Sequence, residues 1–319
     1  MDNSTKALVH QLNDLSQNDQ VLLEVVRAGR DATPYLVDFL FSAPSLHPQP
    51  RCLAAEALGM MGGPQAVEAL IAVLSKNSQK MMSPQLWLSE KAIRNRACLE
   101  LGRLQATNAI PALMLALQEN RLEGSAYALT ELGVREAIPW LIECLEEDSI
   151  RNAVSECLVH FVPEAFPCLR QTVWDIRIID GVELASSSGR RAEAARLLGD
   201  LDFDASAVIL LKLLRDCQAP VRFNAALALA HRGDASQKKE ALTTLLEFQE
   251  RGCWLEQNLS KEAILSMGKI VLAEACRHCV SPLQANRWSW KSCLALFPFD
   301  SLKRLMGKSK SRETLRKAG

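Results

Sequence analysis

The stretch RCLAAEALGMMGGPQAVEALIAVL, Arg51–Leu74, decides the fold. In its first half, apolar residues recur at i, i+3 and i+4 from Leu53 to Leu58, which is the spacing of an amphipathic helix. Glycines then interrupt the pattern, and Pro64 suits the first turn of a second helix, where its missing N–H costs no hydrogen bond. A helical hairpin of this size cannot bury its apolar face alone, so the stretch predicts neighbouring copies of itself.

Copies of the second helix recur along most of the chain. The nine-residue windows are ATPYLVDFL from Ala32, AVEALIAVL from Ala66, AIPALMLAL from Ala109, AIPWLIECL from Ala137, AFPCLRQTV from Ala165 and SAVILLKLL from Ser206. Proline often takes the third place, where its fixed φ starts a helix without breaking a bond. The fifth place is always leucine and is predicted to be a core position: Leu36, Leu70, Leu113, Leu141, Leu169 and Leu210.

The first helices repeat as well. Their windows are RCLAAEALG from Arg51, RNRACLELG from Arg94, SAYALTELG from Ser125, RAEAARLLG from Arg191 and RFNAALALA from Arg222. Small residues in the middle of each window let neighbouring helices approach closely. Most windows close on glycine, which fits a left-handed helix C-cap. The closing positions predict eight helical pairs: Gly29, Gly59, Gly102, Gly133, Phe161, Gly199, Ala230 and Gly268.

The pattern RxxAAxALGxxG followed by AVxxLxxxL resembles the short bacterial HEAT-like repeats that are named after phycobilisome lyase subunits. The resemblance covers residues 17–275. It implies an all-α fold, a right-handed α-solenoid of about eight HEAT-like pairs whose second helices line the concave side. The family includes pigment lyase subunits, a metal-dependent hydroxylase and scaffolds that bind other proteins, so the resemblance implies these three kinds of function.

The rest of the chain is expected to cap or interrupt this array. Residues 1–16 are polar enough for an N-terminal cap, residues 276–302 are expected to form a C-terminal cap, and the basic segment 303–319 is expected to be disordered. An insertion at 76–90 and an irregular segment at 174–190 break the repeat. We interpret the second break as a kink or a hinge.

Composition restricts the class of protein. The chain has 319 residues, 48% of them hydrophobic, yet no apolar run of membrane-spanning length and no signal-peptide pattern, which predicts a cytoplasmic protein. Ten scattered cysteines fit reduced thiols in such a compartment. The 37 basic and 37 acidic residues balance, but seven basic residues fall after Leu302 and leave the array acidic. An acidic array disfavours a nucleic-acid-binding groove.

The sequence offers little for catalysis or metal binding. The hydroxylases of this family hold iron with His-Glu pairs, and none of the five histidines here precedes a glutamate. Cys276 and Cys279 could begin a zinc site, or they could be buried by a terminal helix. No spacing suggests a nucleophile beside a base, and the carboxylates are expected mostly on solvated faces. We therefore predict no catalytic residue, no cofactor and no metal.

Candidate partner-binding residues come from two places. The fourth and seventh window places share one helix face and carry aromatic and charged side chains, which suggests an interaction ridge or, for Tyr35 and Trp140, packing between pairs. The insertion contributes apolar side chains that either bind a partner or cover the core. The candidates are Tyr35, Asp38, Met81, Met82, Trp87, Leu115, Trp140, Glu143, Gln171 and Lys212.

One basic residue type recurs in the first helices. Arg51, Arg94, Arg191 and Arg222 occupy the same window place. Recurrence favours a structural ladder that bonds neighbouring loops or carboxylates over substrate recognition.

The sequence favours a non-catalytic adaptor that presents the concave face of a HEAT-repeat solenoid to another protein, as a monomer or in a hetero-complex. The alternative is a bilin lyase-like or chaperone-lyase subunit, as the resemblance implies. A HEAT-like DNA glycosylase is a third reading, which the negative balance of the array opposes.

Overall fold

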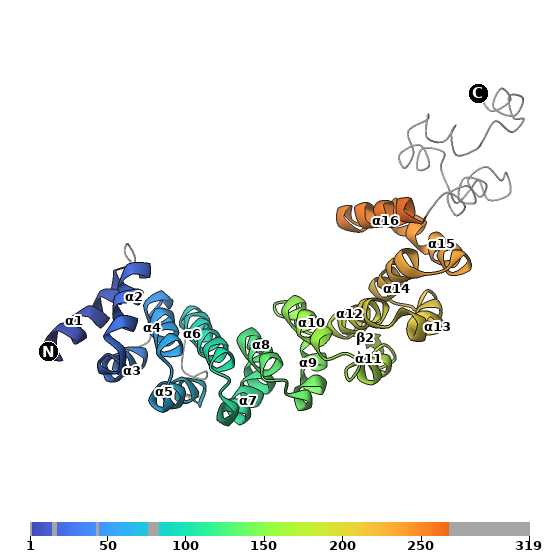
Figure 1. Ribbon diagram of the computed structural model, residues 1–319. Helices are drawn as coiled ribbons and strands as arrows, with labels where there is room; N and C mark the ends of the chain where they lie inside the picture. The colour runs from blue at the N-terminus through green and yellow to red at the C-terminus, as the bar shows by residue number, and fades with distance from the viewer. Residues whose placement is uncertain (1, 15–17, 43–44, 76–82, 268–319) are drawn as a thin grey trace, which may run out of the picture. The chain divides into compact units, whose positions relative to one another are not determined.

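The computed structural model describes residues 2–14, 18–42, 45–75 and 83–267 (Figure 1). Over these residues the chain is all-α apart from one two-stranded hairpin, and successive helices pack in pairs, which confirms the predicted solenoid class. The chain divides into two compact units, Met1–Cys168 and Leu169–Gly319, which we describe separately. The expectations for Met81, Met82, Cys276, Cys279 and segments 276–302 and 303–319 fall outside the described residues.

The first unit contains an N-terminal helix followed by pairs of first and second helices. Its helices are α1 (Asp2–His10), α2 (Asn18–Ala28), α3 (Thr33–Leu40), α4 (Gln49–Met61), α5 (Pro64–Ser75), α6 (Pro84–Arg103), α7 (Ile110–Asn120), α8 (Glu123–Glu131), α9 (Ile138–Cys144) and α10 (Arg151–His160). Short 3-10 turns at Gln11–Asn13, Gly29–Asp31, Thr107–Ala109 and Arg135–Ala137 lead into or out of them.

The leucines at the fifth window place form the centre of the core. Leu36, Leu70, Leu113 and Leu141 of the first unit are all 0% exposed, as the repeat pattern predicts. The prolines at the third place begin their helices, since α3, α7 and α9 each carry proline in the first turn. Local sequence and tertiary burial therefore agree on where each second helix starts and which face it buries.

Some glycines that close the first-helix windows lie at close contacts between helices and not at helix C-caps. Gly29 and Gly133 do take positive φ values of 65° and 66°. Gly59 and Gly102 instead lie inside helices, and a Cβ at Gly102 would come within 2.9 Å of the Ala128 Cα on α8. At these two positions, and at Gly199 of the second unit, the C-cap prediction is wrong, because glycine is needed there for close packing of helices.

The row of first helices is the tighter of the two rows. α4 packs along α6, and α6 along α8, whereas neighbouring second helices such as α5, α7 and α9 touch only briefly (Figure 1). In a curved array the row with the closer spacing lies on the inner side. The packing in the first unit therefore turns the second helices outward, opposite to the concave placement that the resemblance implied.

The segment expected to be an insertion loop is partly helical. α6 begins at Pro84, with Ser83 as its N-cap accepting from the Leu86 N–H, and runs as one helix to Arg103. Trp87 is half-buried on this helix, with its ring 5.3 Å from the guanidinium carbon of Arg94. The insertion thus lengthens a first helix by more than two turns.

The second unit starts within α11 (Phe166–Thr172) and continues the helical pairs after a hairpin. Its remaining elements are β1 (Ile178–Ile179), β2 (Val182–Glu183), α12 (Ala185–Leu201), α13 (Phe203–Leu213), α14 (Ala219–Arg232), α15 (Ala235–Arg251) and α16 (Trp254–Ser266). Leu169 and Leu210 are again 0% exposed. α12 packs along α14, and α14 along both α15 and α16.

The irregular segment 174–190 contains the hairpin and the first turns of α12. β1 and β2 pair antiparallel, Ile178 opposite Glu183 and Ile179 opposite Val182, around Asp180 and Gly181. Both turn residues have positive φ, 51° and 79°, which is the Asp-Gly signature of a tight two-residue hairpin turn. Strands this short leave no periodic pattern, so the sequence did not predict them.

Candidate functional site

Recurrent arginines bond the C-terminal ends of second helices. The last carbonyls of a helix have no partner within it and carry its partial negative charge, so a guanidinium is stabilising there. The bonds run from Arg51 Nε to the Leu40 carbonyl (2.8 Å), from Arg151 Nε to the Leu145 carbonyl (2.7 Å) and from Arg191 Nε to the Val173 carbonyl (2.9 Å). All three acceptors occupy the ninth place of their windows.

The other two arginines of the predicted ladder make different contacts. Arg222 is half-buried and donates to the Asp216 and Cys217 carbonyls, at 2.9 and 3.0 Å, in the loop before α14. Arg94 is buried, stacks on Trp87 and donates to the Asn120 side chain at 3.4 Å. Arg151 was not among the predicted arginines, because it lies two residues before the start of the nine-residue window that closes at Phe161.

Two of these arginines also neutralise buried carboxylates. Arg51 of α4 forms an ion pair with Glu90 of α6, and both side chains are almost completely buried. In the second unit, Arg191 donates to both oxygens of Glu183 at 3.0 Å and pairs with Asp216. Burial alone would lower the pKa of Arg191, but the bonds to Asp216 and Glu183 raise it overall.

Two glutamates are exceptions to the expectation that the carboxylates lie mostly on solvated faces. Glu90 and Glu100 are both buried. Burial raises the pKa of the Glu100 carboxyl above its ordinary value, although Arg103 and Arg96 act in the opposite direction. The Arg103 Nη1 lies 3.0 Å from the Glu100 carboxylate. Glutamate is tolerated in this packed row because arginines of neighbouring turns reach it.

The predicted ridge residues of the first unit do lie on the outward face of second helices. We call Tyr35, Asp38, Leu115, Trp140 and Glu143 the second-helix row. Leu115 on α7 is 48% exposed and Trp140 on α9 is 39% exposed. Asp38 is exposed, whereas Tyr35 and Glu143 are half-buried. Gln171 and Lys212 are exposed in the second unit.

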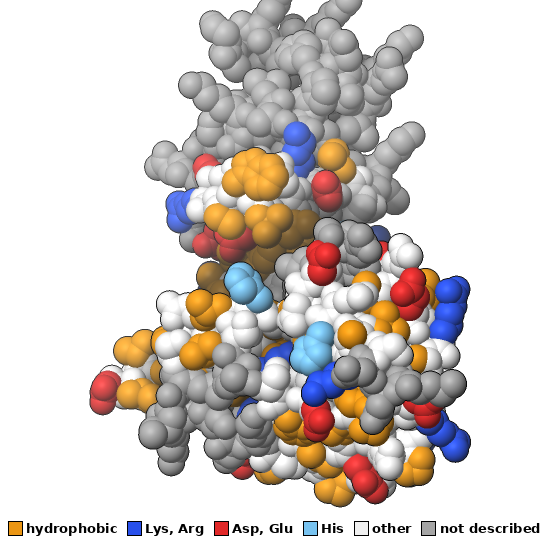
Figure 2. Space-filling model, turned by 90° about the vertical axis from the view of Figure 1, so that its left-hand side faces the viewer, with side chains coloured by type: hydrophobic (Ala, Val, Ile, Leu, Met, Phe, Trp, Pro, Cys, Tyr) orange, Lys and Arg blue, Asp and Glu red, His pale blue; other side chains and the backbone are white. Residues whose placement is uncertain are grey.

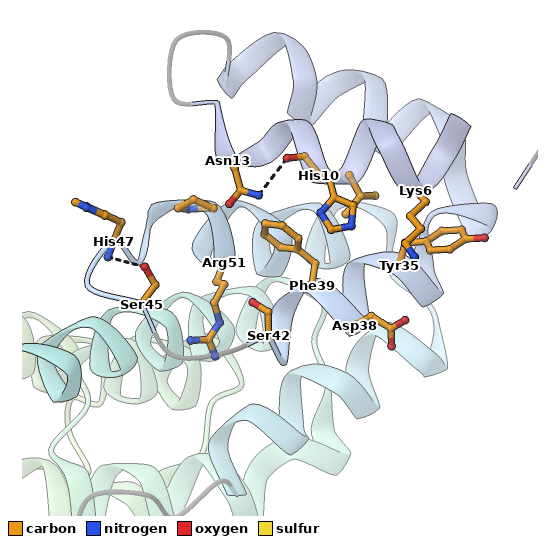
Figure 3. A pocket seen from close by; sticks show the side chains of 12 residues that line it. Lys6, His10, Asn13, Tyr35, Asp38, Phe39, Ser42, Ser45, His47 and Arg51 are labelled. Carbon is orange, nitrogen blue, oxygen red and sulfur yellow. Dashed lines mark hydrogen bonds between the residues drawn. The ribbon is translucent and has the colours of Figure 1, made fainter. Parts of the chain in front are cut away.

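A cavity of about 570 Å³ opens at the N-terminal end of this row. Figure 3 shows Lys6 and His10 coming from α1, and Tyr35, Asp38 and Phe39 from α3. The His10 and Phe39 rings meet edge to face, 5.9 Å apart. The cavity combines an apolar wall with the acidic Asp38 and the basic Lys6 and Arg51, which suits binding of a mixed polar and apolar group.

Burial suppresses the reactivity of two cysteines in the described chain. Burial raises the pKa of the Cys52 and Cys157 thiols to about 11 each, so neither is a ready nucleophile. Among the described residues, no three His, Cys, Asp or Glu side chains come together to hold a metal. Seven cysteines within this part of the chain are free thiols.

The face of the molecule drawn in Figure 2 carries no basic stripe of the kind that binds nucleic acid. In Figure 2, basic side chains are interspersed with acidic ones and do not gather in a stripe. A groove for a phosphate backbone would need such a stripe. No helix in the described ranges has both the length and the apolar character to cross a membrane.

Three solved structures resemble the chain at low sequence identity. They are the complex of CpcE and CpcF of phycocyanin lyase from Nostoc sp. PCC7120 (TM-score 0.33, 20% identity, 81% of this chain and 94% of that chain), human deoxyhypusine hydroxylase (0.30, 17%, 88% and 97%) and an engineered protein (0.33, 14%, 92% and 94%). We infer no function from them. No curated protein matches the sequence.

A family model does match the chain at two places. The PBS lyase HEAT-like repeat is found at residues 50–76, which hold α4 and α5, and at residues 123–147, which hold α8 and α9. The pairs between and beyond these matches repeat the same arginine, glycine and leucine positions. The chain therefore contains PBS lyase HEAT-like repeats at these two places.

Proposed function

We propose that the chain is a non-catalytic adaptor that takes a protein partner on the second-helix row. The exposure of Leu115 and Trp140 carries this proposal, because the array's own packing leaves both apolar side chains in water. They lie on α7 and α9, which contact each other. A partner seated there would touch several repeats at once, with Trp140 as its anchor.

The polar members of the row support a protein partner over a small ligand alone. Asp38 and Glu143 give the row an acidic rim around its apolar side chains. An apolar centre with a charged rim is the usual anatomy of a protein interface. A hetero-complex, in which the partner is a different protein, follows most simply.

The partner can be sought directly. The full chain, immobilised from its C-terminal end, is used to capture proteins from its own cell extract, and the Trp140→Ala variant serves as the matched control. We expect at least one protein to be recovered with the parent chain and depleted with the variant. Equal recovery by both chains would contradict the role of the row.

A bilin lyase-like or chaperone-lyase subunit is the second candidate. The repeat matches at 50–76 and 123–147 favour it, and the second match includes Trp140 and Glu143. Mixing the purified chain with a bilin, alone and with any captured partner, distinguishes the candidates. A shift of bilin absorbance would support the lyase-like role, and an unchanged spectrum in both mixtures would favour the adaptor function.

A further inference from the structure

The hairpin of the second unit exposes a dense group of apolar side chains. Ile178, Ile179 and Val182 are 59%, 58% and 69% exposed, and Trp174 just before β1 is 48% exposed. We call these four residues the hairpin patch. Ile179 and Val182 pair across the strands and share one face of the hairpin, whereas Ile178 lies on the other face. Exposed apolar side chains gathered on one small element mark a docking site in a soluble protein.

The hairpin patch is held in place instead of folding onto the core. Glu183 at the end of β2 is buried against Arg191, and its carboxylate also accepts from the Ser187 hydroxyl at 3.1 Å. Ser187 Oγ in turn accepts from the Arg177 N–H at 3.0 Å, at the start of the hairpin. A hairpin fixed at its base and closed by a tight turn presents its apolar side chains without reorganisation.

A second exposed apolar surface of the same unit lies on α16, the last described helix. Trp254 and Leu255 of α16 are exposed, and the chain runs on directly from Met267 at the end of that helix. The second helices α5, α13 and α15 pack on the first helix before them, and KIVLAEACRHCV (269–280) has the apolar spacing of a further such helix. Ser281 and Pro282 then end that pattern.

The next apolar stretch is WSWKSCLALFPF, Trp288–Phe299. Twenty residues separate Met267 at the end of α16 from Trp288, and a chain of this length can span up to about 70 Å. The hairpin leads directly into α12, which is two helix spacings from α16 through α14, or about 20 Å. The stretch can therefore reach the hairpin patch.

Charge also suits this pairing. Asp180 stands exposed at the hairpin tip, while Asp175 and Glu183 are paired with Arg190 and Arg191. The stretch is flanked or interrupted by four basic residues and one acidic residue: Arg287, Lys291, Asp300, Lys303 and Arg304. A second copy of the hairpin would bring another acidic tip, with Arg177 as the one basic residue directly beside its strands.

We infer that residues 288–299 of the same chain dock on the hairpin patch and cover its apolar side chains. Tethering places the segment at an effective concentration near the millimolar range, which favours it over a free copy of the chain. The inference concerns the second unit and does not rest on the proposed function. It makes the C-terminal region part of the folded unit and names the surface that it occupies.

Cross-linking in the full chain tests the inference, because Cys293 lies within the segment. Val182→Cys is introduced with Cys217→Ser and Cys253→Ser to remove the exposed thiols, and disulfide formation is driven with diamide. We expect a bond within one molecule between position 182 and Cys293, at least about tenfold more abundant than with Val208→Cys. Val208 is an exposed control on α13.

Two results would overturn the inference. One is a product that joins two molecules, which would assign the hairpin patch to a second copy. The other is preferential bonding of Cys293 to Trp254→Cys, which would place the segment on α16.

Hydrogen exchange of the full chain without engineered thiols provides an independent readout. Peptides covering 288–299 should exchange about tenfold more slowly than in an Ile178→Asp, Val182→Asp variant, and Val208→Asp should leave them unchanged. Equal exchange rates of these peptides in all three chains would refute docking on the hairpin.

Discussion

Gly59 of α4 faces Glu100 of α6 so closely that a Cβ at position 59 would lie 2.6 Å from the Glu100 Cβ. The glycine thus makes room for a buried carboxylate in the row of first helices. Helix propensity alone would favour alanine at a mid-helix position by about 1 kcal/mol. Packing opposes propensity at this position.

Gly59→Ala should destabilise the first unit by about 1–3 kcal/mol, because the added methyl group forces α4 and α6 apart. The urea midpoint followed by circular dichroism measures the change. Met60→Ala, at an exposed neighbouring position, should shift the free energy of unfolding by no more than about 0.5 kcal/mol. A stabilising effect of Gly59→Ala would mean that propensity outweighs the contact.

Glu100 should make the first unit less stable as pH rises. Its folded-state pKa is raised by burial, so the folded chain holds this proton more tightly than the unfolded chain, whose pKa is about 4.3. The free energy of unfolding therefore falls as pH rises from about 4.3 through the folded pKa. Glu100→Gln should remove this part of the pH dependence, and Glu119→Gln, at an exposed carboxyl on α7, should not. An opposite slope would mean that Arg96 and Arg103 outweigh burial.

Arg191→Ala should cost the second unit about 3–5 kcal/mol, because it leaves Glu183 and Asp216 buried without their counter-charge. Arg196→Ala on the same helix removes ion pairs with Glu193 and Asp200 that lie nearer the solvent, and should cost less than about 1 kcal/mol. Urea unfolding of both variants gives the comparison. Similar costs would show that the buried cluster adds nothing beyond a surface pair.

Leu141→Ala should cost about 2–5 kcal/mol, as expected for a core leucine that is 0% exposed. Leu115→Ala, in the preceding window on α7 and half in solvent, is the matched comparison. We expect its free energy of unfolding to change by less than half as much. A cost for Leu141→Ala below about 1 kcal/mol would mean that the site collapses around the loss.

The sequence predicts the regular part of this fold because each repeat position has one environment. Leucine at the fifth place and proline at the third recur, so burial and helix starts follow from pattern alone. Arg151 could not be placed, since it lies two residues out of frame. Glutamate takes the seventh window place twice, as Glu100 and Glu131, each opposite the closing glycine of the preceding first helix, but a charged residue gives no sign of burial at that place. For the hairpin, the one signal in the sequence is the Asp180-Gly181 pair, which is typical of a tight turn. Within the candidate site, the exposure of Trp140 and Leu115 could be predicted, because their places in the helical repeat put them on the outer face. The cavity at Lys6 could not be predicted, because it depends on how α1 packs.

The last prediction concerns partner binding at the second-helix row. Trp140→Ala should weaken binding of the captured partner by about 2 kcal/mol or more, because a central aromatic anchor carries a large share of the affinity. Val159→Ala removes an apolar side chain of similar exposure from α10, outside the row, and should leave the affinity unchanged. Glu143→Lys should mainly slow association and alter its salt dependence, since a rim charge steers encounter.

Titration calorimetry gives the affinities, stopped-flow mixing gives the association rates, and circular dichroism checks that each variant stays helical. The adaptor model requires that Trp140→Ala lose affinity at unchanged melting temperature. If the variant binds normally and melts early, Trp140 serves to pack α9 against its neighbours. Binding would then have to use another surface, because Leu115 alone offers the row no aromatic anchor.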